Sequence, residues 1–177
     1  ASTSTDGLAW TSRVKAFNGA LCRPVWAPSL AKWCVVNGQN VNVLGSTGSF
    51  LTADGITWTD HVVAATPPKG VTSVCWSPAL SKFVAVSGVN NSPTYTRNAY
   101  TSSNGETWAA FNITGSDVDW SRVIWVPELA LFVAVAGFSE IGGGGTAGTI
   151  AATSTDGETW TLRTLPSSQK WIDLAWN

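Results

Sequence analysis

The chain has 177 residues, enough for one domain whose core buries roughly 70% of the extended-chain surface. Its formal net charge is −1 and only 12% of its residues are charged, so it has no basic field to hold nucleic acid or an anionic membrane surface. No stretch approaches the ~18 consecutive apolar residues of a membrane-spanning helix. We therefore expect one domain that neither binds nucleic acid nor inserts into a membrane.

One eight-residue stretch recurs four times and organises the chain. Its copies are residues 3–10, 51–58, 101–108 and 153–160, which end at Trp10, Trp58, Trp108 and Trp160. A period near fifty residues is typical of a repeat architecture. The Asp-Gly or Asn-Gly pair in each copy favours a tight two-residue hairpin turn, because such a turn needs a positive φ. We expect the Asp or Asn side chain to accept turn N–H groups and the Trp to fold over the turn.

Between these turns, the same strand-like elements return in the same order. An apolar run ending in Trp comes first, at residues 23–26, 73–76, 122–125 and 173–176. A dense run of small and β-branched residues follows, at 33–36, 83–86 and 132–135, which favours strands covered on both faces. The remaining two strands flank the Asp-Gly turn. With no helical period anywhere, the sequence predicts an all-β chain in which each repeat is one four-stranded blade of a β-propeller.

The two ends of the chain carry only parts of a repeat. Residues 1–13 supply the third and fourth strands, and residues 171–177 supply only the first. We predict a single domain, 1–177, with a partial blade built from both ends and complete blades at 14–63, 64–111 and 112–170. That partial blade lacks its second strand, so its first strand would meet the third in the wrong direction for an antiparallel ladder.

Three outcomes are compatible with these incomplete ends. A second subunit completes the ring, the ring closes as four blades with one defective sheet, or the chain is a section of a longer protein. We favour assembly into a homo-oligomer or with a neighbouring subunit, because exposed strand edges invite pairing.

The turn motif resembles the Asp-box of sialidase-type (BNR-like) β-propellers, and the fuller repeat is similar to repeats of phage and environmental proteins. The residues that carry the resemblance are Asp6, Trp10, Asp54, Trp58, Asn104, Trp108, Asp156 and Trp160, with Asn104 in place of the usual Asp. The resemblance implies that the boxes lie on outer turns away from the active face, so they are expected to be structural. A sialidase would also need an arginine cluster, a Tyr nucleophile and an acid/base Asp, and no further motif matches.

The eleven tryptophans and three cysteines are expected to be mainly core residues. Every Trp has a repeat position, although Trp33, Trp120 and Trp171 remain candidates for sugar-stacking platforms. Cys22, Cys34 and Cys75 form no C-x-x-C pair, so buried thiols are favoured and a Cys22–Cys34 bridge stays open. We expect neither a metal nor a cofactor.

The long loops on one face are the candidate binding surface, because variable loops on a rigid scaffold commonly carry function. Their polar, mostly uncharged residues suit carbohydrate hydroxyls, although Asn, Gly and Ser also form ordinary loops. The candidate residues are Asn40, Asn42, Asn91, Tyr95, Arg97, Asp117, Asp119 and Trp120.

The sequence lacks a recognisable catalytic set, and we expect the chain not to be an enzyme. The favoured function is a structural or binding module, oligomeric and belonging to a virion or an extracellular surface, although the sequence does not fix the compartment. The alternative is a glycan-binding lectin that uses the loop face. A third hypothesis is a reduced glycosidase that uses Asp117 and Asp119 as its paired carboxylates.

Overall fold

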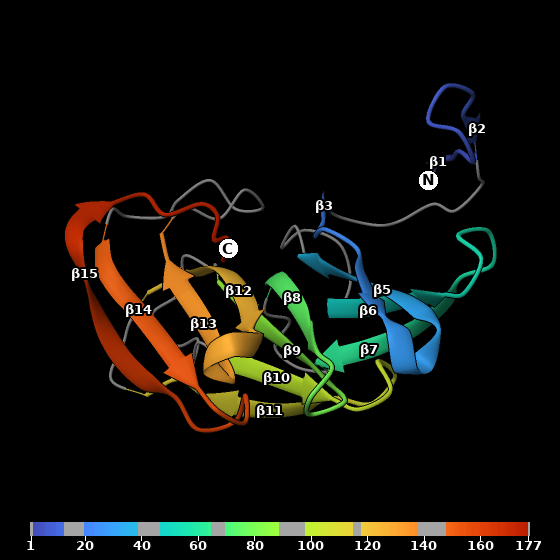
Figure 1. Ribbon diagram of the computed structural model, residues 1–177. Helices are drawn as coiled ribbons and strands as arrows, with labels where there is room; N and C mark the ends of the chain where they lie inside the picture. The colour runs from blue at the N-terminus through green and yellow to red at the C-terminus, as the bar shows by residue number, and fades with distance from the viewer. Residues whose placement is uncertain are drawn as a thin grey trace.

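The computed structural model describes residues 2–12, 20–38, 47–64, 70–88, 98–114, 118–137 and 148–176, and these form an all-β structure (Figure 1). Its helical segments are two three-residue 3₁₀ turns, η1 (Pro28–Leu30) and η2 (Pro127–Leu129). Within the described ranges, no helix has the length and hydropathy needed to cross a bilayer. The prediction of an all-β fold is confirmed.

The strands form antiparallel sheets that follow one another along the chain. An N-terminal hairpin comes first, with strands β1 (Ser2–Thr3) and β2 (Thr11–Ser12). We call the next three the first, second and third repeat sheets. The first contains β3 (Ala20–Leu21), β4 (Val25–Ala27), β5 (Lys32–Gly38), β6 (Thr47–Thr52) and β7 (Thr59–Ala64). The second contains β8 (Val71–Ser77), β9 (Lys82–Ser87), β10 (Asn98–Ser102) and β11 (Ala109–Asn112). The third contains β12 (Trp120–Val126), β13 (Leu131–Ala136), β14 (Gly148–Ser154) and β15 (Thr161–Gln169).

Each repeat begins with the same strand, turn and strand. Pro28, Pro78 and Pro127 follow the first strand, where their fixed φ suits a tight turn. The turn ends at a residue of positive φ, and the second strand starts at the next residue. The positive-φ residues are Ala31, Ser81 and Ala130, with φ of 48°, 48° and 49°. The second strands β9 and β13 are largely buried, as their dense apolar sequences predicted.

The Asp-box turns keep the predicted hydrogen bonds but not the predicted length. In the first repeat sheet, Asp54 Oδ1 accepts the N–H groups of Ile56 and Thr57 at 2.7 Å each, and Trp58 Nε1 donates to the Gly55 carbonyl. The last paired residues are Leu51 and Thr59, so the two-residue turn is wrong. Only the glycine of each box has a positive φ, whereas the expected turn type needs two such residues.

Side-chain hydrogen bonds connect neighbouring repeat sheets. In each repeat the donor stands four residues before the first-strand Trp. The hydroxyl of Thr72 donates to the carbonyl of Trp120 at 2.6 Å, and the hydroxyl of Ser121 donates to the carbonyl of Trp171 at 2.7 Å. The thiol of Cys22 makes the equivalent bond to the Val71 carbonyl at 3.2 Å. These bonds place the first strands of successive repeats side by side, with two apolar cores between the sheets.

All three cysteines are buried and none is in a disulfide, so the Cys22–Cys34 bridge that the sequence left open is not formed. Burial raises the pKa of Cys34 to about 12, and it also raises the pKa of Cys75. The described residues contain no group of three or more His, Cys, Asp or Glu side chains placed to hold a metal ion.

Candidate functional site

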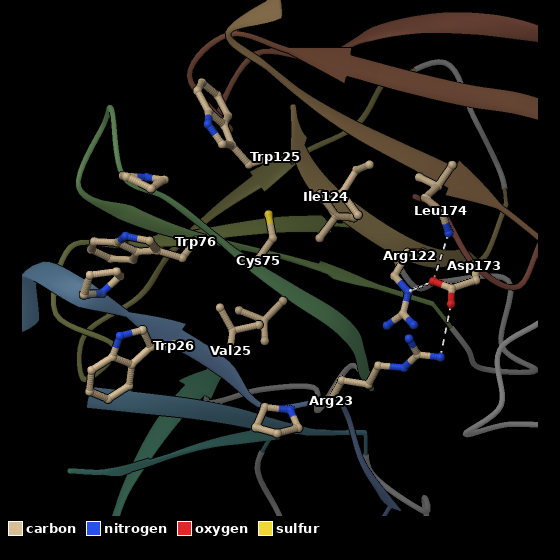
Figure 2. A pocket seen from close by; sticks show the side chains of 15 residues that line it. Arg23, Val25, Trp26, Cys75, Trp76, Arg122, Ile124, Trp125, Asp173 and Leu174 are labelled. Carbon is tan, nitrogen blue, oxygen red and sulfur yellow. Dashed lines mark hydrogen bonds and ion pairs between the residues drawn. The ribbon is translucent and has the colours of Figure 1, made fainter. Parts of the chain in front are cut away.

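Residues at the first-strand position of all four repeats line one cavity of about 450 Å³ (Figure 2). The walls come from residues 23–26 and Pro28, from residues 74–76 of β8 and the Pro78 that follows this strand, from residues 122–125 of β12 and from residues 173–174. Segments from both ends of the chain therefore meet around one space. A volume of this size is within the range of small-molecule sites. We call this space the axial cavity.

One part of the axial cavity holds a cluster of three charged side chains. Asp173 accepts a hydrogen bond from Arg122 Nε at 2.7 Å through Oδ1, and its Oδ2 lies 3.1 Å from Arg23 Nη2. The hydrogen bond from Arg122 is the main reason that the pKa of Asp173 lies below its ordinary value. The Arg122 side chain is largely buried and that of Arg23 is 69% exposed, so Arg23 can move toward a ligand at little cost.

Three tryptophans at one repeat position form another part of the wall, namely Trp26, Trp76 and Trp125. Each packs against the aromatic residue that is the second residue of the second strand in its own repeat. The ring centroids are 5.2 Å apart for Trp26 and Trp33, 4.5 Å for Trp76 and Phe83, and 4.7 Å for Trp125 and Phe132. Trp26 stays 39% exposed, so part of its ring is open to contact.

The indole N–H of Trp76 is an unusual feature of this wall. The residue is 7% exposed, and its Nε1 has no hydrogen-bond partner. A buried donor without a partner costs about 1–3 kcal/mol. The Nε1 atom itself is buried, so this donor does not face the open space of the axial cavity.

The structure describes only two of the eight loop residues that the sequence singled out. Asn40, Asn42, Asn91, Tyr95, Arg97 and Asp117 lie outside the described residues, and their role stays a prediction. Asp119 directly precedes β12, and its carbonyl accepts the Gly137 N–H at 3.1 Å. Trp120 has no exposed surface, so its ring belongs to the core and offers no stacking platform in this structure.

The two other candidate platforms differ in their exposure. Trp33 is 40% exposed, whereas Trp171 is partly buried and donates its Nε1 to the Gly148 carbonyl at 3.0 Å.

Sequence reasoning missed the charged cluster of the axial cavity. Arg23, Arg122 and Asp173 all stand three residues before a repeat Trp, where the second repeat has Ser73. Alignment of the repeats therefore placed two opposite charges at one structural position. That change of charge at one repeat position was the available signal, because the first-strand positions of successive repeats lie side by side.

Comparison with known proteins shows that the fold of this chain is similar to that of several solved structures. No protein-family profile and no curated protein sequence matches the chain. Among solved structures, it is similar to an N-acetylgalactosamine deacetylase from F. plautii in complex with blood group B trisaccharide, with a TM-score of 0.53 and 15% identity. This match covers 91% of the chain and 59% of the deacetylase.

Two β-fructofuranosidases match at a similar level. The enzyme from Bombyx mori in complex with sucrose has a TM-score of 0.52 and 12% identity, over 84% of this chain and 35% of the enzyme. The enzyme from Schwanniomyces occidentalis in complex with fructosyl-erythritol has a TM-score of 0.52 and 17% identity, over 85% and 35%. The chain thus spans between a third and three fifths of these structures.

These solved structures of similar fold contradict one prediction from the sequence, which concerns enzymatic activity. We expected the chain not to be an enzyme, but these structures of similar fold are those of glycoside hydrolases and a deacetylase. The missing catalytic motif was a poor ground for exclusion, because catalytic residues are placed by the fold and need no recognisable spacing in the sequence.

Proposed function

We propose that this chain is a carbohydrate-binding module of β-propeller type, whose ligand enters the axial cavity. In this proposal the three repeat sheets are complete blades. Residues 2–12 and 171–176 are parts of a fourth blade around the same axis. The similar structures in complex with sugars support the ligand class, since three of them hold a trisaccharide, sucrose and fructosyl-erythritol.

The observation that carries the proposal is the chemistry of the axial cavity. A sugar ring presents apolar C–H faces that stack on aromatic rings, and hydroxyl groups that need both donors and acceptors. Trp26 supplies an exposed aromatic surface. The cluster of Arg23, Arg122 and Asp173 supplies donors and a carboxylate acceptor.

Binding is the function that this set of residues supports best. Asp173 is the one carboxylate among the described residues that line the axial cavity, whereas hydrolysis by paired carboxylates uses two. The loop residues predicted from sequence offer a second surface for the same ligand class. Membership of a virion or of an extracellular surface stays a prediction.

Calorimetric titration with a panel of neutral and acidic oligosaccharides tests the proposal. We expect saturable binding that weakens at least tenfold in Trp26→Ala and in Arg23→Ala. Trp10→Ala is the matched control, because Trp10 is 65% exposed and lies outside the axial cavity.

Two results would count against the axial cavity. One is that no oligosaccharide of the panel binds. The other is that a bound sugar is insensitive to both cavity variants, which would move the site to the loops if Asn91→Ala or Tyr95→Ala abolished binding. Release of reducing sugar, measured in the same samples, shows whether the bound ligand is also turned over.

A further inference from the structure

Each Asp-box turn of the second and third repeat sheets packs on the sheet that precedes it in the chain. A Cβ on Gly105 would lie 2.8 Å from Leu51 of the first repeat sheet, and a Cβ on Gly157 would lie 2.5 Å from Val84 of the second. Both glycines are buried. The contact between one sheet and the box of the next is therefore a repeated feature, which we call the box contact.

An ion pair accompanies both of these box contacts. Lys32 Nζ lies 3.3 Å from Glu106 Oε1, and Lys82 Nζ lies 2.9 Å from Glu158 Oε1. In each case the lysine is the first residue of the second strand of one sheet, and the glutamate follows the box glycine of the next sheet. The same two positions therefore face each other in both contacts, and they carry opposite charges.

Leucine occupies each of these two positions in the parts of the chain that the ion pairs leave out. Leu131 is the first residue of β13, and Leu8 follows Gly7 in the N-terminal hairpin. A leucine opposite a lysine or a glutamate would take water away from a charge without supplying an opposite charge. The sheet that carries Leu131 is therefore best matched by a box that carries an apolar residue at this position.

Two boxes meet this condition, since Ile56 stands at the same position in the first repeat sheet. The box of Ile56 already has a neighbour, because Thr3 Cγ2 lies 3.2 Å from where a Cβ on Gly55 would be. Among the described residues, nothing lies within 4 Å of the same position on Gly7. The box of the N-terminal hairpin is therefore the one that fits the third repeat sheet.

The third repeat sheet is incompletely covered at the end where such a box would pack. Val133 pairs with Thr153, and both residues are only partly buried. The equivalent pairs of the first and second sheets lie at box contacts and are buried, namely Cys34 with Leu51 and Val84 with Thr101. The third repeat sheet thus presents the surface of a box contact without a box from the described residues.

The box of the N-terminal hairpin is exposed where the boxes of the second and third sheets are buried. Leu8 is 88% exposed and Trp10 is 65% exposed, whereas Trp160 in the box of the third sheet is 8% exposed. The hairpin therefore carries apolar surface of the kind that marks a contact site.

The two surfaces are not in contact within one chain. Figure 1 shows the hairpin of β1 and β2 apart from the body of the molecule, beyond the first repeat sheet, with the third repeat sheet on the far side. Both surfaces consist of described residues, 4–10 of the hairpin and 131–133 and 153 of the sheet. A hairpin that projects in this way can reach a second molecule.

We propose that a second copy of this chain supplies the box that covers the third repeat sheet. Leu8 of one copy packs on the partner's Leu131, and its Gly7 approaches the partner's Val133. Two copies can make this contact reciprocally, each giving one hairpin and accepting one, which produces a closed dimer. The apolar pair makes the contact specific, because a box that carries glutamate does not fit a sheet that carries leucine. None of these residues lines the axial cavity, so dimerisation can be tested apart from sugar binding.

Sedimentation equilibrium over a wide range of concentrations measures the dissociation constant of the dimer. We expect the mass to rise with concentration from that of one chain to that of two. Leu8→Glu and Leu131→Lys should each raise the dissociation constant at least tenfold, because each places a charge opposite a leucine. The double variant Leu8→Glu/Leu131→Lys recreates the ion pair of the other box contacts and should restore the dimer.

Mixing the two single variants tests whether the contact is made between copies. A hairpin with Leu8→Glu can bind a sheet with Leu131→Lys, and the unchanged hairpin can bind the unchanged sheet. The mixture should therefore dimerise at concentrations where each variant alone is a monomer. Leu129→Glu is the control and should leave the dissociation constant unchanged, because Leu129 is 52% exposed and lies in η2, before the contact. Circular dichroism and urea unfolding verify that every variant is folded.

Three results would overturn the proposal. The chain is a monomer at every concentration, or the two single variants dimerise as strongly as the original chain. The third is that the single variants weaken the dimer but the double variant or the mixture does not restore it, which would show that Leu8 and Leu131 do not face each other between copies.

Discussion

Arg23 and Asp173, near opposite ends of the chain, form an ion pair in which Nη2 and Oδ2 are 3.1 Å apart. The same carboxylate accepts a hydrogen bond from Arg122 at 2.7 Å. First-strand residues of the first, third and last repeats therefore meet at one point. The ion pair is too exposed to contribute much to stability, and its importance is geometric. It brings residues from the first and last repeats together, as the proposed arrangement of blades around one axis requires.

Glycine in the Asp-box sets how closely neighbouring sheets approach. In Gly157→Ala, the new Cβ would lie 2.5 Å from Val84 Cγ2, in addition to the strain of a φ of +79°. Gly7→Ala adds only the φ strain, because nothing lies within 4 Å of its Cβ position. We expect Gly157→Ala to lower the free energy of unfolding by about 1–3 kcal/mol more than Gly7→Ala. Urea denaturation measures both, and equal losses would show that the sheets do not pack through this glycine.

The hydrogen bond from the Thr72 hydroxyl to the Trp120 carbonyl is expected to be a main stabilising contact between the second and third repeat sheets. Thr72→Val keeps the shape but leaves the Trp120 carbonyl without this donor, so the loss should be about 1–3 kcal/mol. Thr161→Val, at an exposed position of β15, should change stability by less than about 0.5 kcal/mol. Thermal and urea unfolding of the two variants provide the comparison. A Thr72→Val variant as stable as the control would refute this assignment.

The hydrogen bonds of the Asp-boxes should make the free energy of unfolding sensitive to acid. Hydrogen bonds from the Thr57 and Ile56 N–H groups and the Thr52 hydroxyl lower the pKa of Asp54 from 3.8 to about 2. Since the folded-state pKa lies below the unfolded one, the contribution is complete above the unfolded value. It is lost as the pH falls toward 2. Asn104 fills the same position in the second repeat sheet and cannot titrate. Asp54→Asn should therefore give a shallower loss of stability between pH 4 and pH 2 than the original chain, and a parallel loss would contradict this.

The buried thiols should be inert in the folded chain. Burial disfavours the thiolates of Cys34 and Cys75, because it raises the pKa of each. We expect a thiol reagent at pH 8 to modify neither of them until urea unfolds the chain, and peptide mapping by mass spectrometry identifies the sites. Rapid modification of Cys75 under native conditions would show that the core between the second and third repeat sheets opens readily.

The local structure of the repeated turns and strands could be predicted from the sequence, whereas the contacts between repeats could not. The strand order, the burial of β9 and β13 and the hydrogen bonds of Asp54 follow from local pattern and turn chemistry. The turn length was wrong because an Asp-Gly pair also fits a longer turn, in which only Gly55 has a positive φ. Trp120 shows the limit of reasoning by residue type, since a candidate stacking platform is a fully buried core residue.

The axial cavity depends on contacts between distant repeats, which no local pattern specifies. The charges of Arg23 and Asp173 were visible in the sequence, but their meeting depends on how far each sheet rotates from the last. The prediction that the chain is not an enzyme had the same weakness, because it rested on motifs and not on the arrangement of the sheets.

Cross-linking between residues 23 and 173 tests most directly whether the repeats surround a common axis. The three native thiols are buried, so Arg23→Cys and Asp173→Cys can be combined in one chain and treated with a short bismaleimide. Arg23→Cys with Arg163→Cys, on the outer strand β15, is the control pair. We expect an efficient cross-link within single chains for residues 23 and 173 and none for the control pair. No cross-link, or one formed only between separate chains, would contradict it.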